Sequence, residues 1–126
     1  MGFANISRHP AEKWPRAQIL AAAKIGGGIT DYEFPTISPG ADDGYVWDKM
    51  QQVADLVLRD GHEHAMVVGE YAATIALVQI LVDSNFRVWM PSFENGHAIE
   101  ERGEQRLRTR PFVRFREVTK FLRRQQ

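Results

Sequence analysis

Short apolar runs along the first ninety residues predict four β-strands. The first run, Phe3–Ser7, stands at the start of the chain, and residues 65–68 are continuously apolar, as in a strand buried on both faces. Residues 29–34 alternate apolar and polar side chains, which is typical of a half-buried strand. Residues 87–90 form the fourth run, which we expect to end at Pro91.

Three helices are predicted between these strands, because apolar residues there recur every three or four positions. The first spans about 15–24, with Pro15 in its first turn and the triple glycine at 26–28 as its end. The second covers 46–57, and Asp42 or Asp43 can cap it. The third covers 72–83 and follows a sharp turn.

This order, β-α-β-α-β-α-β, predicts a Rossmann-like α/β fold with a mostly parallel sheet and right-handed crossovers. After Pro91 the pattern changes, because Asn95-Gly96 and Gly103 are turn signals. Phe112, Val113 and Phe115 predict a last strand. It lies either antiparallel at a sheet edge or in a hairpin with residues near Ile99.

Composition narrows the class of protein. The 126 residues, 44% hydrophobic and 25% charged, fit a single globular domain over 1–126. Cysteine is absent, which excludes disulfides, thiolate nucleophiles and zinc–thiolate sites. The start of the chain lacks a signal-peptide pattern, and the longest apolar stretch, 72–82, is too short to span a bilayer. We therefore expect a cytoplasmic protein without a membrane partner.

Charge is segregated along the chain, although the net charge is zero. From Arg102 onward nine Lys and Arg stand against two Glu, a net of +7, so the first 101 residues carry −7. This asymmetry favours an anionic ligand or self-association of unlike patches, and a solvated basic tail is the alternative.

Candidate chemistry lies where the predicted parallel strands end, because ligands of open α/β sheets collect there. Ser7, Arg8 and His9 follow the first strand and offer a hydroxyl, a guanidinium and an imidazole for acid–base work or phosphate binding. The alternative is that His9 bonds to a loop carbonyl and that Arg8 is solvated.

The ends of the third and fourth strands supply the candidate ligand-binding residues. Gly69, before the third helix, lets a ligand approach the backbone closely. The Glu70 carboxylate would repel phosphate, so it suits ribose hydroxyls or a base amino group better. Thr74 could contact ligand or bond back to a carbonyl. The set is Gly69, Glu70, Tyr71 and Thr74 after the third strand, and Ser92 and Asn95 after the fourth.

Two further groups carry alternatives. Arg110, Arg114 and Arg116 share one face of the last strand and suit phosphates or an acidic partner, unless the strand is only solvated. His62, Glu63 and His64 lie at the amino end of a predicted strand, where neighbouring side chains point to opposite faces, so we predict no metal site there. His97 is expected to face solvent in a turn. No set of carboxylates has metal-binding spacing, and we expect neither metal nor cofactor.

Three stretches together resemble a family. They are Asn5-Ile6-Ser7-x-His9-Pro10-x-x-Lys13-Trp14-x-x-x-Gln18, then Val67-Val68-Gly69-Glu70-Tyr71-x-x-Thr74-x-Ala76-Leu77-Val78, then Phe112-Val113-Arg114-Phe115-Arg116-Glu117. In this order they resemble small stand-alone Rossmann-like proteins related to CRISPR-associated CARF proteins and small ring nucleases. The resemblance covers most of the chain, and the His-Pro and Trp segment is its most specific part.

The resemblance implies a homodimer in antiviral defence that binds a cyclic oligoadenylate, not a long nucleic acid, across its two-fold axis. It further implies metal-independent cleavage, in which a ribose 2′-hydroxyl attacks the adjacent phosphate and leaves a cyclic 2′,3′-phosphate. Three groups of residues take part by position: Ser7, Arg8 and His9 would be catalytic, Gly69, Glu70 and Thr74 would shape the nucleoside pocket, and Ser92 and Asn95 would complete its rim. Asn5, Tyr71, Arg114 and Arg116 complete the predicted binding residues.

Three hypotheses remain open at this point. The first is a ring nuclease that degrades a cyclic nucleotide messenger. The second is a binding module of the same fold that senses or sequesters the nucleotide intact. The third is an unrelated small α/β protein whose basic strand serves assembly.

Overall fold

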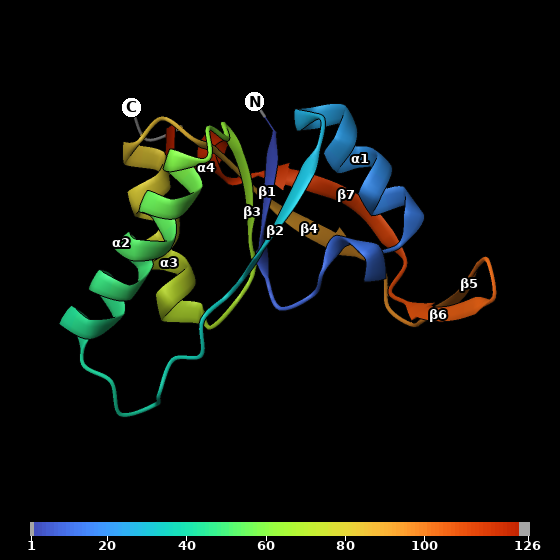
Figure 1. Ribbon diagram of the computed structural model, residues 1–126, viewed down its shortest axis with the longest axis horizontal. Helices are drawn as coiled ribbons and strands as arrows, with labels where there is room; N and C mark the ends of the chain where they lie inside the picture. Colours follow the sequence, from blue (N-terminus) through green and yellow to red (C-terminus); the bar gives the residue numbers. More distant parts are fainter. Residues whose placement is uncertain (1, 124–126) are drawn as a thin grey trace.

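The computed structural model describes residues 2–123 and builds one five-stranded sheet and one separate hairpin (Figure 1). The elements follow the chain as β1 (Phe3–Ser7), a 3₁₀ turn η1 (Ala11–Lys13), α1 (Arg16–Gly26), β2 (Ile29–Glu33), α2 (Asp43–Arg59), β3 (His64–Val67), α3 (Tyr71–Asp83), β4 (Arg87–Phe93), β5 (Ala98–Arg102), β6 (Gln105–Thr109), β7 (Phe112–Glu117) and α4 (Val118–Arg123).

The main sheet has the strand order β2-β1-β3-β4-β7. The first four strands are parallel, and β7 pairs antiparallel with β4. This arrangement confirms the predicted Rossmann-like α/β fold. The chain reverses its direction of travel across the sheet between β1 and β3, which is the place where such folds bind ligands.

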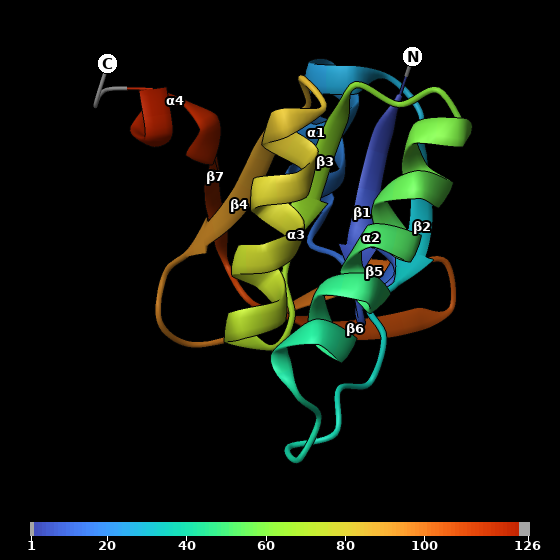
Figure 2. The ribbon, with the colours of Figure 1, turned by 90° about the vertical axis from the view of Figure 1, so that its left-hand side faces the viewer.

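Helices cover both faces of the sheet (Figure 2). Helix α1 lies on one face, where Phe3, Trp14, Ala22 and Phe115 form a compact aromatic cluster. Helices α2 and α3 lie on the other face, over a larger aliphatic core. Because alternate residues of a strand point to opposite faces, Phe3, Asn5 and Ser7 of β1 all face α1. The three helices fall where the apolar spacing predicts them, and Asp42 caps α2 by accepting from the Tyr45 N–H at 2.8 Å.

The prediction that the fourth strand ends at Pro91 is wrong, because β4 continues to Phe93. Strand β3 pairs with β4 only as far as Trp89, and beyond it β4 pairs with β7 alone. Pro91 has no N–H to donate, and at its position no β3 residue needs one. For the last strand, the structure confirms the sheet-edge alternative, since β7 pairs with β4 and not with residues near Ile99.

The segment near Ile99 forms a hairpin of its own. Strand β5 pairs antiparallel with β6, so that Ile99 lies opposite Arg108, and Gly103 forms the turn with a positive φ of 60°. The sequence pattern predicts the turn but not the β6 strand. No helix within residues 2–123 is long and apolar enough to cross a membrane.

An ion pair with a buried carboxylate joins the neighbouring strands β4 and β7 at the end of the sheet remote from the hairpin. Glu117 accepts from Arg87 Nε at 2.9 Å and from Arg87 Nη2 at 2.8 Å, and the Thr119 hydroxyl donates to it at 3.1 Å. The Glu117 side chain is only 6% exposed. The Arg87 hydrogen bonds outweigh the effect of burial and lower the pKa of Glu117 from 4.5 to about 2.

We predict that this pair makes stability depend on acid pH. The folded-state pKa of Glu117 is depressed, so its contribution is present above pH 4.5 and is lost as the pH falls toward about 2. Glu117→Gln should lower the free energy of unfolding by about 2 kcal/mol near neutral pH, and its deficit relative to wild type should shrink below about pH 4. Urea titrations at several pH values measure this. Glu104→Gln in the exposed turn is the control, and a deficit that stays constant with pH would contradict the assignment.

Candidate functional site

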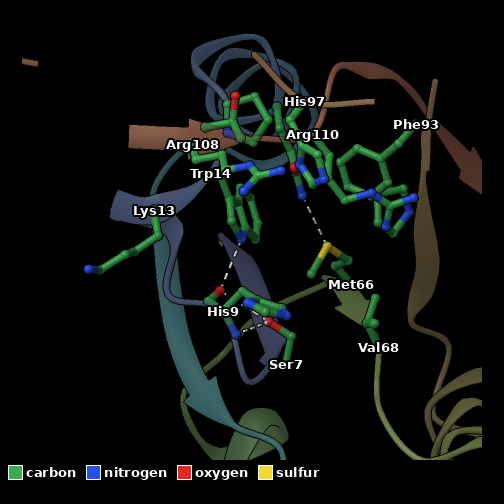
Figure 3. A pocket seen from close by; sticks show the side chains of 14 residues that line it. Ser7, His9, Lys13, Trp14, Met66, Val68, Phe93, His97, Arg108 and Arg110 are labelled. Carbon is green, nitrogen blue, oxygen red and sulfur yellow. Dashed lines mark hydrogen bonds between the residues drawn. The ribbon is translucent and has the colours of Figure 1, made fainter. Parts of the chain in front are cut away.

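A pocket of about 460 Å³ lies at the carboxyl ends of β1, β3 and β4, on the face of the sheet that α1 covers. The β5–β6 hairpin and the residues after it close its other side (Figure 3). Its lining is shared by four segments: Ser7, His9, Lys13, Trp14, Pro15 and Gln18 from the first, Met66 and Val68 from β3, Pro91 and Phe93 from β4, and His97, Arg108, Thr109 and Arg110 from the hairpin.

A network of hydrogen bonds fixes the turn after β1. Asn5 Nδ2 and Trp14 Nε1 both donate to the His9 carbonyl, at 2.9 and 3.0 Å. The Ser7 hydroxyl lies 2.7 Å from Asn5 Oδ1, to which it donates, and it accepts from the His9 N–H at 3.1 Å. Asp31 joins the network from β2 by accepting from Asn5 Nδ2 at 2.9 Å. The His-Pro segment is thus held rigidly at the pocket floor, while the His9 side chain is exposed.

The hairpin is attached to the segment that leads into α1. The Arg102 guanidinium donates to the carbonyls of Glu12 and Trp14. Glu100 accepts from the Arg16 N–H, the first residue of α1, at 3.0 Å, and pairs with Arg102 at 3.0 Å. Since α1 has no side-chain cap of its own, Glu100 caps it from a distant strand. These contacts hold the hairpin's pocket residues over the strand ends.

The pocket lining is cationic. It contains Lys13, Arg108 and Arg110 together with His9 and His97, and no carboxylate occurs among its fourteen residues. None of its three Lys and Arg side chains has a salt-bridge partner within residues 2–123. In Figure 3 the Lys13 ammonium points away from the centre. Both arginines come from the hairpin side.

Aromatic and apolar side chains form the rest of the wall. The Arg110 guanidinium carbon lies 4.5 Å from the centre of the Phe93 ring, and its N–H groups make no hydrogen bond with the described residues. Trp14 is buried and stands across the pocket from Met66 and Val68 (Figure 3). An anionic ligand that also has a flat apolar part fits such a lining.

Two buried polar side chains in the lining lack ordinary partners. Gln18 is 2% exposed, and its Nε2 donates to the Met66 sulfur at 3.7 Å, a weak acceptor. Thr109 is 5% exposed, and its hydroxyl has no hydrogen-bond partner among the described residues.

The predicted catalytic residues have different surroundings. Ser7 and His9 line the pocket, whereas Arg8 does not and instead donates to the Thr36 hydroxyl. The Ser7 hydroxyl proton is used in the bond to Asn5, and Asn5 itself lies behind the lining at 1% exposure.

The residues predicted after β3 belong to the opposite face. Gly69 packs against Phe34 so closely that a Cβ would come within 2.5 Å of the ring. The Glu70 carboxylate caps α3 by accepting from the Ala73 N–H at 3.0 Å, and Tyr71 is 90% exposed. Thr74 lines a separate hollow of about 200 Å³ between α3, β4 and α4. Of this turn only the preceding Val68 reaches the main pocket.

The remaining predicted residues lie outside the pocket lining. Ser92 is flanked by the lining residues Pro91 and Phe93, and Asn95 precedes the turn at Gly96. Arg114 and Arg116 are exposed, and they alternate with Phe115, which packs on the α1 side. They therefore point to the other face of the sheet.

The sequence reasoning did not select eleven of the lining residues: Lys13, Trp14, Pro15, Gln18, Met66, Val68, Pro91, Phe93, His97, Arg108 and Thr109. Arg110 entered the sequence reasoning only as part of an arginine row. Two features of the sequence could have identified some of these lining residues. Lys13, Trp14 and Gln18 belong to the first stretch of the family resemblance, and Arg108 belongs to the basic run from 106 to 110.

His62, which precedes β3, and His64, the first residue of β3, both form hydrogen bonds with neighbouring side chains. His62 Nε2 lies 2.9 Å from the Tyr32 hydroxyl, which donates to Asp60 at 2.6 Å. His64 accepts from Trp89 Nε1 at 3.2 Å, and burial lowers the pKa of His64. Within the described residues no group of three His, Cys, Asp or Glu could hold a metal ion.

Comparison of the chain with family models, curated proteins and solved structures finds no match. What is shown of the family resemblance is therefore the α/β fold with a mostly parallel sheet.

We predict that Arg102 holds the hairpin in place. Arg102→Ala should raise the hydrogen-exchange rates of the amides in 98–109 by at least about tenfold, because two charge-assisted bonds to backbone carbonyls are lost. The melting temperature should change little, since the hairpin lies outside the main sheet. Arg106→Ala is the matched control, because Arg106 makes only an exposed 3.9 Å ion pair with Glu101. Equal exchange rates in both variants would show that Arg102 does not hold the hairpin.

Proposed function

We propose that the pocket binds a cyclic oligoadenylate and cleaves it without a metal ion, as the family resemblance implies for a CRISPR-associated ring nuclease. The observation that carries the proposal is the lining, which combines unpaired arginines with aromatic walls and contains no carboxylate. Arginine matches phosphate in geometry as well as charge, and aromatic side chains stack on bases of any sequence.

The arginines of the hairpin hold the phosphates in this proposal. Arg108 and Arg110 follow one another on the same side of the pocket and remain charged at every physiological pH. A base enters between Trp14 and Phe93. The whole pocket is the size expected for a small ligand, so it holds one part of a ring and a second copy of the chain holds another. This division is why we propose a homodimer as the binding form.

Cleavage needs correct positioning and proton transfer. The ribose 2′-oxygen attacks the neighbouring phosphorus, the bond to the 5′-oxygen breaks, and a cyclic 2′,3′-phosphate and a free 5′-hydroxyl result. The 2′-hydroxyl proton must leave and the 5′-oxygen must gain one. His9 lines the pocket, and its ring makes no hydrogen bond with the described residues, so it can accept or donate such a proton. Arg108 stabilises the additional charge on the phosphorane.

A specific observation favours a second candidate, a sensor that binds the ring and returns it intact. Of the three residues expected to be catalytic, Ser7 already donates its proton to Asn5 and Arg8 bonds Thr36 outside the lining. Catalysis would then rest on His9 and the hairpin cations alone.

We predict that wild-type protein in EDTA converts cyclic tetra-adenylate or cyclic hexa-adenylate to linear products with cyclic phosphate ends. His9→Ala should slow the reaction at least about a hundredfold, the usual contribution of a general acid or base, with an unchanged melting temperature because the side chain is exposed. Chromatography of the products measures this. Arg8→Ala, assayed in parallel, tests the predicted role of its neighbour. Recovery of intact ring from a stable complex would support the sensor, and absence of binding to either ring would refute both candidates.

We also predict that Arg108 contributes strongly to affinity. Arg108→Ala should weaken binding of cyclic tetra-adenylate about tenfold or more, and should reduce the salt dependence of binding, because a phosphate contact is lost. Calorimetry at two salt concentrations measures both effects. Arg106→Ala on the same strand is outside the lining and should bind as wild type does. If both variants lost affinity equally, only general attraction by the basic hairpin would be involved.

A further inference from the structure

The pocket lining includes two buried polar side chains that lack ordinary partners. Gln18 projects from the first turn of α1, and Thr109 from the end of β6. The amide nitrogen of Gln18 reaches the Met66 sulfur, a contact drawn as the dashed line to that sulfur in Figure 3. The amide oxygen of Gln18 accepts no hydrogen bond from the described residues, and the Thr109 hydroxyl has no partner among them either, so both can bond to a ligand.

Polar groups buried without partners destabilise a protein, since water no longer satisfies them. A complementary ligand removes this cost by supplying a donor and an acceptor at the same place. The surrounding side chains are apolar, Trp14, Met66 and Phe93 among them. The lining therefore suits a flat ring with a polar edge, whereas a bare phosphate could accept from the Thr109 hydroxyl but would offer no donor to the Gln18 amide oxygen.

We propose that Gln18 and Thr109 form a base-recognition subsite that selects adenine by its 6-amino edge. The Gln18 amide oxygen accepts from the amino group, and the Thr109 hydroxyl donates to a ring nitrogen. Arg108 and Arg110 remain the phosphate-binding residues. The inference rests on the proposed function, for which it names the residues that read the base.

Selectivity follows from the burial of these groups. A site built to hydrogen-bond a ligand group rejects an analogue that lacks it, because the buried partner is then left unsatisfied. Purine lacks the 6-amino group and has nearly the same shape as adenine. It should therefore bind more weakly than adenine, and the difference should depend on Gln18.

The test uses two pairs of probes and calorimetry. The first pair is cyclic tetra-adenylate and the same ring built from purine riboside, and the second is adenosine and purine riboside 5′-monophosphates. Wild-type protein should prefer the adenine member of each pair about tenfold. Gln18→Met keeps the length and helix preference of the side chain but removes the amide, and should abolish the preference. Thr109→Val should weaken binding of both members of a pair.

Stability measurements distinguish recognition from a structural role. Both variants remove a poorly satisfied buried group, so their melting temperatures should equal or exceed that of wild type. Gln79→Met is the control, since Gln79 is exposed and bonds Asp83 at 3.0 Å.

The outcomes separate this inference from the proposed function. An adenine preference that is absent from wild type, or that survives in Gln18→Met, overturns the subsite. Binding of neither ring, together with a Gln18-dependent adenine preference among the monophosphates, upholds the subsite and refutes the cyclic ligand.

Discussion

Attachment of the β5–β6 hairpin to the start of α1 is the interaction on which the pocket depends. Without it the sheet, its two cores and its helices are complete, but only one side of the pocket exists. Arg102 and Glu100 bind backbone carbonyl and N–H groups of residues 12–16, so the contact is insensitive to most side chains there. An isolated two-stranded hairpin is marginally stable in water, and its order here comes from these bonds.

The same attachment decides how an anion can be held. Parallel α/β sheets commonly bind phosphate at helix N-termini. Here the N-terminus of each of the three helices that connect the parallel strands, α1, α2 and α3, is already bonded to a carboxylate of the chain itself. Glu100 occupies the start of α1, Asp42 that of α2 and Glu70 that of α3. In the proposed function, phosphate is therefore bound by side chains, and the two arginines of the pocket lie in the segment from residue 102 onward, where positive charge is concentrated. Part of the positive charge of the C-terminal segment is thus located at the pocket, in Arg108 and Arg110.

Sequence reasoning predicted the part of the molecule that obeys simple periodicity. The buried parallel strands and three amphipathic or apolar helices have patterns that local physics dictates, and the turn at Ser7 was correctly expected at a strand end. It could not predict β6, whose alternating arginines resemble a solvated tail until the docking of the hairpin is known. Nor could it predict toward which face of the sheet the residues after a strand end would point. After β3, Val68 lines the pocket, whereas Gly69 packs on Phe34 and leads into α3 on the opposite face.

The arrangement of the lining separates affinity from chemistry. In the proposed function, cations at the hairpin side and buried hydrogen-bonding groups within the pocket bind the nucleotide, and neither requires that a bond be broken. Cleavage adds a stricter demand, because the attacking and leaving oxygens must lie in line with phosphorus. The rigid network of Asn5, Ser7 and the His9 carbonyl meets one part of that demand, since it fixes the backbone from which the His9 ring projects. The other part, the position of the ligand, depends in this proposal on the hairpin, because Arg108 and Arg110 lie on that side of the pocket.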